Sequence, residues 1–523
     1  MEYKQLLESH RDEVVSLLRG LVSFDSSRGE PSGEDRPFGD GVADCYRYLL
    51  EKAAADGFET FDAGGYGGHI EWRGVKDGVA DPAGSEDGVS EKPADETPEP
   101  ADETFGIPVH LDVVPAGEGW TADPFGGEEE GGFIYGRGTT DNKGSASVIY
   151  SAIKALKESG FVPAKNIRII IGLDEETGWN GMDEYLSQVA PPDMGFVPDA
   201  EFPVINGEKG ILNFEIAKKF TTSPEPGFHL TGITGGEAAN MVPGGARAVL
   251  VFEEADSGKK RKGKASGRRE ASGGKGKSKN DKAFAHLREE ADSYCESTKR
   301  RIVCKRAGKA FLVQAEGKSA HGAQPQSGVN AISILMDFLS RFELVDTEAR
   351  EFIDFYNEKI GFETDGASLG IAMSDSPSGG LTVNAGTIRM NKDAVILTMN
   401  VRYPVTKKEE DVFGPMQPLL DAAGVGIIKG KHQPPLFFPE DDEFIRTLMD
   451  VYRNNTGDTE SKPVVIGGGT YARAFSKMVA FGPVFPGEPD LMHKVDERVS
   501  TDSLMKAAAI YADAIYELTK GNL

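Results

Sequence analysis

The chain has 523 residues, of which 39% are hydrophobic, and its formal net charge at pH 7 is −26. This length exceeds that of one ordinary domain, so we expect two domains, each with a core of its own. The strongly acidic balance argues against a general affinity for nucleic acid or for an anionic membrane surface.

Cysteine usage and the first residues indicate a compartment. Cys45, Cys295 and Cys304 are spaced for neither a metal site nor a disulfide framework, which favours a reducing cytoplasm. The start of the chain has no positively charged stretch followed by an apolar core, so no signal peptide is expected. No run approaches the ~18–20 apolar residues of a membrane span. We therefore expect a cytoplasmic protein.

The first hundred residues combine predicted helices with an acidic stretch. Apolar residues at helical spacing predict helices over 3–21 and 39–55, and a short strand is expected over 69–73. Residues 77–103 include ten acidic residues and one lysine among many Pro, Gly, Ala and Thr. Such a segment cannot bury apolar surface, so we expect a disordered insertion without a function of its own.

Three apolar strands of the next part each end in polar residues. They cover residues 107–114, 166–173 and 194–198, and helices are expected over 145–156 and 182–189. The β-branched run 166–173 is typical of a strand that is covered on both faces in a parallel sheet. Strand, polar turn and helix in repetition predict an α/β domain with its site at the carboxyl ends of the strands.

From residue 210 the pattern changes to the alternation of antiparallel strands. Residues 210–435 are expected to form two successive strand–strand–helix–strand units. Within them, residues 257–282 carry eleven Lys and Arg against two acids. This stretch could be a nucleic-acid tail, but it is glycine-rich, lacks aromatic stacking residues and lies in a very acidic protein. We therefore expect a second disordered insertion and no nucleic-acid partner.

The simplest architecture is a split α/β domain that is interrupted by an α+β insertion. Residues 1–208 and 437–523 would form the first domain, and residues 209–436 the second. The closing segment is expected to contribute helices over 441–454 and 503–517, with short strands between them.

Five side chains stand at the ends of predicted strands or in the turns that follow: His110, Asp141, Glu176, Asp199 and His493. Two imidazoles and three carboxylates suit Zn²⁺, Co²⁺ or Mn²⁺, and a bridging carboxylate could hold two ions about 3.5–4 Å apart. Asp112 lies two residues from His110 and could accept its second imidazole N–H. Glu175 could be the general base. Each residue alone also has a plain structural explanation, such as a hydrogen-bonded histidine or a solvated helix start.

Several motifs carry these residues in a fixed order: His110-Leu-Asp112, Gly136-Arg-Gly-Thr-Thr-Asp-Asn-Lys-Gly144, Asp174-Glu-Glu-Thr-Gly178, Pro198-Asp-Ala-Glu-Phe-Pro203 and Met492-His493. Together they resemble the M20-type dinuclear zinc metallopeptidases, which include aminoacylase, acetylornithine deacetylase and carnosinase-type dipeptidases. The pieces Asp199-Ala-Glu-Phe-Pro203 and Gly467-Gly-Gly-Thr-Tyr471 resemble the bacterial PepV or Xaa-His dipeptidase branch of that family.

The resemblance implies a zinc-peptidase-type catalytic domain with a mixed sheet and a dinuclear centre. Asp141 would bridge two zinc ions. His110 and Asp199 would complete one site, and Glu176 and His493 the other. In the resembling proteins the peptide bond after the bridging aspartate is cis.

The same resemblance assigns two further roles around the metal ions and locates the cis bond. Glu175 would be the general base that takes a proton from the metal-bound water. Asp112 would orient the histidine beside it. The cis bond would be Asp141–Asn142 in this chain.

The resemblance also implies that the second domain is a lid made of two similar halves. His321 would lie over the scissile carbonyl, and Arg402, aided by Asn240, would capture the substrate carboxylate, since a guanidinium offers two parallel N–H groups. Gly468 and Thr470, in a glycine turn, would contact the substrate. In the resembling dipeptidases the doubled lid replaces a dimer, so a monomer is expected.

The predicted function is hydrolysis of dipeptides with a free C-terminal carboxylate, by a metal-bridging hydroxide that Glu175 activates. The expected cofactors are two zinc ions, with cobalt or manganese as alternatives, and the expected partner is a small peptide substrate. A deacylase of N-acyl amino acids or an aminopeptidase with the same centre is an open alternative. A catalytically silent binding protein is a third.

Overall fold

The computed structural model describes residues 2–76, 78, 99–221, 223–254, 278–489 and 491–521. The chain divides into two compact units: unit 1 comprises Met1–Gly207 and Phe437–Leu523, and unit 2 comprises Glu208–Leu436. The expected disorder of the two charged insertions concerns mainly residues 79–98 and 255–277, which lie outside the described residues. In the part of the chain that is described, no helix is long and apolar enough to cross a membrane.

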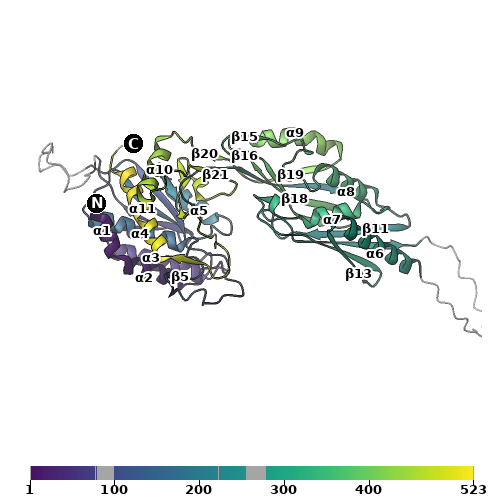
Figure 1. Ribbon diagram of the computed structural model, residues 1–523, viewed down its shortest axis with the longest axis horizontal. Helices are drawn as coiled ribbons and strands as arrows, with labels where there is room; N and C mark the ends of the chain where they lie inside the picture. Colours follow the sequence, from purple (N-terminus) through teal and green to yellow (C-terminus); the bar gives the residue numbers. More distant parts are fainter. Residues whose placement is uncertain are drawn as a thin grey trace, which may run out of the picture. The chain divides into compact units, whose positions relative to one another are not determined.

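Unit 1 combines helices with a central mixed sheet (Figure 1). Its helices are α1 (Glu2–Ser9), α2 (Arg11–Val22), α3 (Asp40–Ala55), α4 (Lys143–Glu158), α5 (Asn180–Gln188), α10 (Glu443–Thr456) and α11 (Thr501–Thr519). The strands of the central sheet are β1 (Glu59–Asp62), β2 (Gly67–Trp72), β3 (Thr104–His110), β6 (Asn166–Gly172), β7 (Met194–Val197), β9 (Ile205–Glu208), β20 (Leu436–Phe437), β21 (Val464–Ile466) and β22 (Met478–Ala480).

The order of the central sheet explains where its polar strand ends meet. The order is β1-β2-β6-β3-β7-β22-β9-β20, and β21 pairs with β9. Every residue of β6 is buried, as the β-branched run predicted, and β6 pairs antiparallel with β2 and parallel with β3. Since β3 also pairs parallel with β7, the carboxyl ends of these three strands lie at one edge of the sheet.

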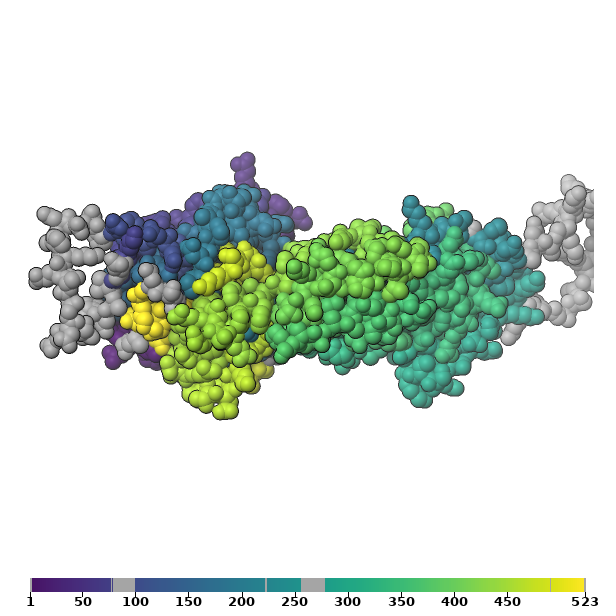
Figure 2. Space-filling model, turned by 90° about the horizontal axis from the view of Figure 1, so that it is seen from above, coloured from purple at the N-terminus to yellow at the C-terminus, as the bar shows by residue number. Residues whose placement is uncertain are grey.

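The last segment of the chain completes the core of unit 1. Strand β22 pairs parallel with β7, and α11 packs against α4 and α10. In Figure 2 the yellow and yellow-green residues of this segment lie against the purple and blue residues of the first segment. Residues from both segments therefore share one hydrophobic core, among them Leu18, Ile153, Leu448, Leu504 and Tyr511.

Two smaller sets of strands complete unit 1. The strands β4 (Glu128–Glu130), β5 (Phe133–Tyr135) and β24 (Arg498–Ser500) form one sheet, and β8 (Ala200–Glu201) pairs with β23 (Pro483–Val484). Antiparallel pairing of Arg498 with Tyr135 brings the segment after His493 next to the segment before Asp141. This small sheet therefore connects two predicted metal ligands that are far apart in sequence.

Two predicted elements of unit 1 end elsewhere than expected. The helix expected over 3–21 is interrupted at His10, because α2 starts afresh with Asp12 and Glu13 in its first turn, where acidic side chains favour a helix start. The strand expected over 107–114 ends at His110. The backbone then turns away, so that the N–H of Val113 donates to the carbonyl of Ser26 at 3.2 Å.

The margins of both charged insertions are ordered, which corrects the expected limits of 77–103 and 257–282. The N–H of Lys76 donates to the carbonyl of Glu99 at 2.8 Å, and the N–H of Asn166 donates to that of Glu103 at 2.8 Å. In the basic stretch, α6 already starts at Lys279, because Ser278 and Asp281 form a capping box. Backbone pairing and a helix cap thus order residues that composition alone assigns to loops.

Unit 2 is a single sheet covered by helices. Its strands are β10 (Gly210–Lys219), β11 (Gly227–Gly235), β12 (Gly245–Glu253), β13 (Arg301–Ala307), β14 (Ala310–Glu316), β17 (Thr382–Met390), β18 (Ala394–Tyr403) and β19 (Gly426–Gln433). Its helices are α6 (Lys279–Thr298), α7 (Ala331–Leu339), α8 (Thr347–Lys359) and α9 (Glu409–Ala422), and a short hairpin joins β15 (Ser374–Asp375) and β16 (Gly379–Gly380). Residues from all four of these helices share one core with the sheet, among them Leu287, Leu335, Phe352 and Met416.

The expectation of two similar halves in this unit is confirmed. The order β11, β12, α6, β13 is strand–strand–helix–strand, and β17, β18, α9, β19 repeats it. In the sheet, β13-β14-β12-β11 is followed by β17-β18-β10-β19, so the halves meet where β11 pairs with β17. The fold is therefore an α/β unit interrupted by an α+β unit made of two similar halves.

Burial of His69 on β2 makes the stability of unit 1 depend on pH. His69 is 8% exposed, and its Nδ1 lies 2.9 Å from the hydroxyl of Tyr185. Burial, together with Arg168 and Arg73, lowers the pKa of His69 to about 3. The unfolded chain takes up this proton near its ordinary pKa of about 6.5, so acidification below that value favours unfolding.

We expect His69→Gln to flatten this dependence. Because His69 stays unprotonated in the folded state, the free energy of unfolding falls by about 2–3 kcal/mol between pH 7 and pH 4.5. The variant removes this contribution. Urea unfolding at the two pH values can be followed by tryptophan fluorescence, because Trp72, Trp120 and Trp179 all lie in unit 1. His10→Gln is the matched control. If the free energy of unfolding fell by the same amount between pH 7 and pH 4.5 in wild type and in His69→Gln, the prediction would be contradicted.

Candidate metal centre

Three of the predicted ligands are placed by the parallel strands of the central sheet. His110 is the last residue of β3, Glu176 lies in the turn after β6, and Asp199 follows β7. His110 is 1% exposed, and the side chains of Glu176 and Asp199 are about nine-tenths buried. Parallel neighbours carry their carboxyl ends to the same edge, which is why residues 89 positions apart can meet here.

Asp141 lies between the two predicted histidines. Its Oδ1 is 2.9 Å from Nε2 of His110, and its Oδ2 is 2.9 Å from Nε2 of His493. The peptide bond Asp141–Asn142 is cis, as the resemblance implied. Gly138, with φ at +89°, lets the preceding turn form, since a Cβ there would lie 2.9 Å from Val113.

The five side chains form two groups that share Asp141. His110, Asp141 and Asp199 make one group, and Asp141, Glu176 and His493 make the other; within each group all ligand atoms lie within 4.8 Å of one another. Imidazole nitrogens and carboxylate oxygens are the donors that Zn²⁺, Co²⁺ and Mn²⁺ accept. The donor set and its spacing therefore fit two divalent cations with a shared carboxylate.

Asp112 connects the end of β3 to the turn that carries Glu175 and Glu176. We expected its carboxylate to accept the second N–H of His110. The nearest acceptor to Nδ1 of His110 is instead the main-chain oxygen of Asp112, at 2.9 Å, and the carboxylate Oδ1 is 3.5 Å away. The carboxylate accepts the backbone N–H groups of Glu175 and Glu176, each at 3.1 Å. The reason is that the strand ends at His110, so Asp112 no longer follows its alternation.

Glu175 lies beside both ligand groups without belonging to either. Its Oε1 accepts the indole N–H of Trp179 at 3.2 Å. Burial raises the pKa of Glu175 well above its ordinary range, and the nearby charges of Asp199 and Glu176 raise it further. A partly buried carboxyl group beside the predicted metal ligands is a candidate general base.

The histidines of the centre are polarised by the carboxylates. Burial opposes protonation of His110, but the nearby carboxylates of Asp112, Asp141 and Asp199 outweigh it and raise the pKa of His110. Hydrogen bonds to Asp141 and Glu176 raise the pKa of His493 to about 10. Because a metal ion binds the neutral imidazole, it must displace these protons, and we expect metal affinity to fall as the pH is lowered.

Asn142 is a residue of the centre that sequence reasoning did not assign. Its Nδ2 donates to the main-chain oxygen of Pro198 at 2.7 Å and to Oδ1 of Asp199 at 3.1 Å. Its Oδ1 accepts the N–H of His110 at 3.4 Å. Asn142 thus holds the two outer ligands of the first group in place. The available signal was its position directly after Asp141 in the glycine-rich motif.

The turn with Gly468 and Thr470 is closed by its own contacts. The carbonyl of Gly468 accepts from Arg473 at 2.9 Å, and the hydroxyl of Thr470 accepts the N–H of Ala472 at 3.2 Å. Tyr471 is fully buried, and its ring lies edge-on to His110 with 6.5 Å between centroids. A Cβ at Gly172 would lie 2.5 Å from this ring, so the glycine permits the close approach.

In unit 2, the predicted lid residues His321, Asn240 and Arg402 belong to one connected region. Met241 and His321 form an isolated antiparallel bridge, and the N–H of Gly322 donates to the carbonyl of Asn240 at 2.7 Å. Asn384 holds the same loop through Ala239 and Met241 at 2.9 and 2.8 Å. Arg402 is 5% exposed, and its Nε donates to Asn400, which lies opposite Asn384 on the next strand.

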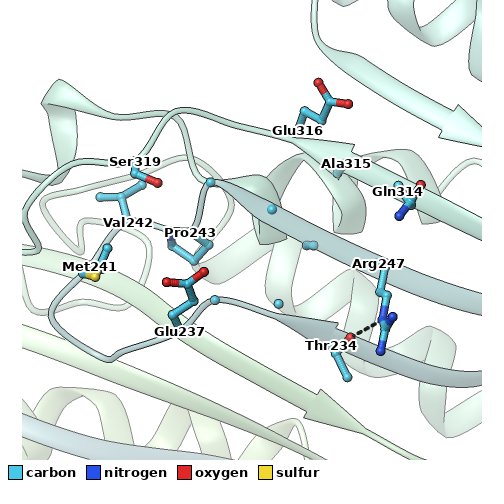
Figure 3. A pocket seen from close by; sticks show the side chains of 15 residues that line it. Thr234, Glu237, Met241, Val242, Pro243, Arg247, Gln314, Ala315, Glu316 and Ser319 are labelled. Carbon is cyan, nitrogen blue, oxygen red and sulfur yellow. Dashed lines mark hydrogen bonds between the residues drawn. The ribbon is translucent and has the colours of Figure 1, made fainter. Parts of the chain in front are cut away.

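A cavity of about 510 Å³ lies beside this loop within unit 2 (Figure 3). The ends of β11, β12 and β14 form its walls, and Met241, Val242 and Pro243, which follow Asn240, lie at one end. Ser319, two residues before His321, completes that end. The loop that carries Asn240 is therefore bordered by open space.

Comparison with known proteins agrees with this geometry. The family model described as peptidase family M20/M25/M40 matches residues 106–517. The chain is 34% identical over 520 residues to “Putative dipeptidase SH1171” of Staphylococcus haemolyticus and 33% identical over 513 residues to “Putative dipeptidase YtjP” of Bacillus subtilis. These matches cover 99% of both chains in the first case and 98% of both in the second.

A solved structure shows the same fold. The crystal structure of aminoacylhistidine dipeptidase from Vibrio alginolyticus matches 97% of this chain and 96% of its own length, with a TM-score of 0.53 and 16% identity. The family match and the two relatives confirm the resemblance seen in the motifs. The chain belongs to peptidase family M20/M25/M40.

Proposed function

We propose that the protein is a metal-dependent dipeptidase that hydrolyses the amide bond of dipeptides with a free C-terminal carboxylate. The observation that carries the proposal is the pair of ligand groups that share Asp141, with Glu175 beside them. The dipeptidase names of the relatives from Staphylococcus haemolyticus and Bacillus subtilis support the substrate class.

The two ligand groups would each hold one divalent cation, zinc in our proposal. His110 and Asp199 would bind one ion, Glu176 and His493 the other, and Asp141 both. When bound, such a pair supplies a hydroxide at neutral pH and polarises the amide carbonyl. Two ions that share a carboxylate lie close together. They suit this reaction because the attacking water and the carbonyl oxygen that gains negative charge are also only a few ångströms apart.

Glu175 would move the proton in the reaction. It takes the proton from the attacking water and returns it to the leaving amine. The indole N–H of Trp179 fixes one oxygen of this carboxylate, so the other oxygen would face the attacking water in a defined direction. Asp112 supports the arrangement, because it holds the backbone N–H groups of Glu175 and Glu176.

The residues of unit 2 would bind the substrate. The imidazole of His321 would stabilise the oxyanion, a contribution that is worth ~2.7–4 kcal/mol per donor in comparable sites. Arg402 would hold the C-terminal carboxylate through two parallel N–H groups, and Asn240 would assist. Recognition of that carboxylate would select the peptide bond before the C-terminal residue for hydrolysis.

We expect Arg402→Ala to raise KM for dipeptides by about 10–100-fold, as the loss of a charge-assisted bidentate contact implies. For the corresponding dipeptide amides, which have no carboxylate, KM should be similar in variant and wild type. Arg389→Ala, an exposed arginine on the neighbouring strand β17, is the matched control. An equal loss for dipeptides and their amides would remove the assigned role.

A substrate panel separates the proposed function from its alternatives. Release of free amino acids is measured from dipeptides, tripeptides, amino-acid amides and N-acetyl amino acids under the same metal concentration. Preferred hydrolysis of dipeptides supports the proposal. Preferred hydrolysis of N-acetyl amino acids would identify a deacylase instead, and hydrolysis of amides and tripeptides an aminopeptidase.

A further inference from the structure

Glu497 is a buried carboxylate that none of the roles above explains. Its side chain has no exposed surface, and it lies four residues after His493 and directly before β24. Strand β24 pairs with β5, which precedes the turn that carries Asp141. Glu497 therefore lies where the segments of two metal ligands come together.

One oxygen of Glu497 is surrounded by backbone donors of the Asp141 turn. Its Oε1 accepts the N–H groups of Gly138, Thr140 and Asp141 at 3.1, 2.9 and 3.3 Å. Its own main-chain oxygen accepts the N–H of Gly136 at 2.9 Å. Successive backbone N–H groups that converge on one carboxylate oxygen fix the course of a turn. This turn presents the carboxylate that both ligand groups share.

The other oxygen of Glu497 binds a buried arginine. Nη1 of Arg137 lies 2.6 Å from Oε2, and the Arg137 side chain is 2% exposed. The guanidinium also lies over the ring of Trp120, 5.2 Å from its centroid. Oε1 of Glu497 thus accepts from the turn while Oε2 pairs with Arg137, so the buried negative charge of Glu497 is compensated.

We propose that Glu497 is a positioning residue that joins the segments of Asp141 and His493 and so sets the affinity of the centre for its metal ions. The inference rests on the metal centre of the proposed function. It differs from a purely structural role, in which the Arg137–Glu497 pair would stabilise the fold but leave metal affinity unchanged. Residues that orient metal ligands typically change metal affinity by about 10–100-fold when they are replaced.

Unit 1 offers a matched control in a second buried ion pair. Glu71 of β2 is also fully buried, and its Oε2 lies 2.6 Å from Nε of Arg168 on β6. Its partners among the described residues are the side chains of Arg168 and Arg73, and no backbone N–H of a turn with a predicted metal ligand is one of them. Glu71→Gln should therefore have the stability cost of a disturbed ion pair without its consequence for metal binding.

The test compares Glu497→Gln, Glu71→Gln and wild type as full chains. A glutamine amide has one oxygen, so it can accept from the backbone N–H groups or from Arg137 but not from both. Zinc affinity is measured by competition with a chromophoric chelator, and the unfolding of each metal-free protein is measured separately. We expect zinc to bind Glu497→Gln about 10–100-fold more weakly than wild type, and activity to return as zinc is added.

Each outcome decides the inference. A loss of zinc affinity at least about fivefold greater in Glu497→Gln than in Glu71→Gln supports it, and a smaller difference contradicts it. If metal-free Glu497→Gln does not fold, Glu497→Asp, which keeps the buried charge but shortens the side chain by one methylene, takes its place under the same criterion. Wild type that binds fewer than two ions would instead contradict the proposed metal centre.

Discussion

Glu175→Gln is expected to lower kcat by about 10²–10⁴-fold, the usual contribution of a general base, while both metal ions stay bound. The amide is close in size to the carboxyl group and can still contact Trp179, but it cannot take a proton from water. Since Glu175 belongs to neither ligand group, its replacement removes proton transfer and leaves the metal-binding donors in place.

The experiment measures kcat and metal content on the same preparation. Glu184→Gln, an exposed carboxylate on α5, is the control and should match wild type in both. Turnover of Glu175→Gln within a few-fold of wild type would remove the assigned role. Loss of metal along with activity would show that Glu175 is a ligand rather than a base.

The second large effect is expected from the shared ligand. Asp141→Ala removes a donor from both groups at once, whereas Asp199→Ala removes one from the first group alone. We expect Asp199→Ala to retain the ion held by Asp141, Glu176 and His493. Asp141→Ala should weaken the binding of both ions by more than the ~10–100-fold that follows loss of a residue that only orients a metal ligand. Activity should disappear.

Metal-to-protein ratios after dialysis against a weak chelator distinguish the two variants. The expected ratios are about one for Asp199→Ala and below one for Asp141→Ala, because two neighbouring cations need a bridging carboxylate. Equal metal content in the two variants would show that Asp141 belongs to a single site. The comparison uses two buried aspartates of the same centre, so both carry a similar structural cost.

Much of the fold follows from local pattern. The β-branched residues of β6 predicted a strand buried on both faces, and the change to alternation at residue 210 predicted the start of a second unit. The break at His10 was missed because apolar spacing continues through it, although the acidic first turn of α2 was a signal. The start of α6 was missed because lysines dominate its first residues, while a capping box decides where it begins.

The candidate site was predictable where side-chain chemistry carries the signal. His110, Asp141 and His493 are residue types that few structural roles require together, and family motifs surround them. Glu497 was not assigned, because it acts through backbone N–H groups of Gly138 and Thr140, more than 350 positions away in sequence. Such contacts depend on the pairing of β24 with β5, which no local pattern predicts.

The roles within the centre depend on atoms rather than residues. Asp112 was assigned from strand alternation, yet its main-chain oxygen is nearest to the imidazole of His110, and its carboxylate holds the next turn. Sequence identifies the residue because only a few side chains fit the motif. The functional atom follows from where β3 ends, and that depends on its neighbours in the sheet.

The most direct measurement is anomalous diffraction at the zinc edge from crystals of the zinc-loaded protein. Two peaks about 3.5–4 Å apart, with one oxygen of Asp141 directed at each, are the result this account requires. A single peak, or zinc bound away from His110 and His493, would contradict it.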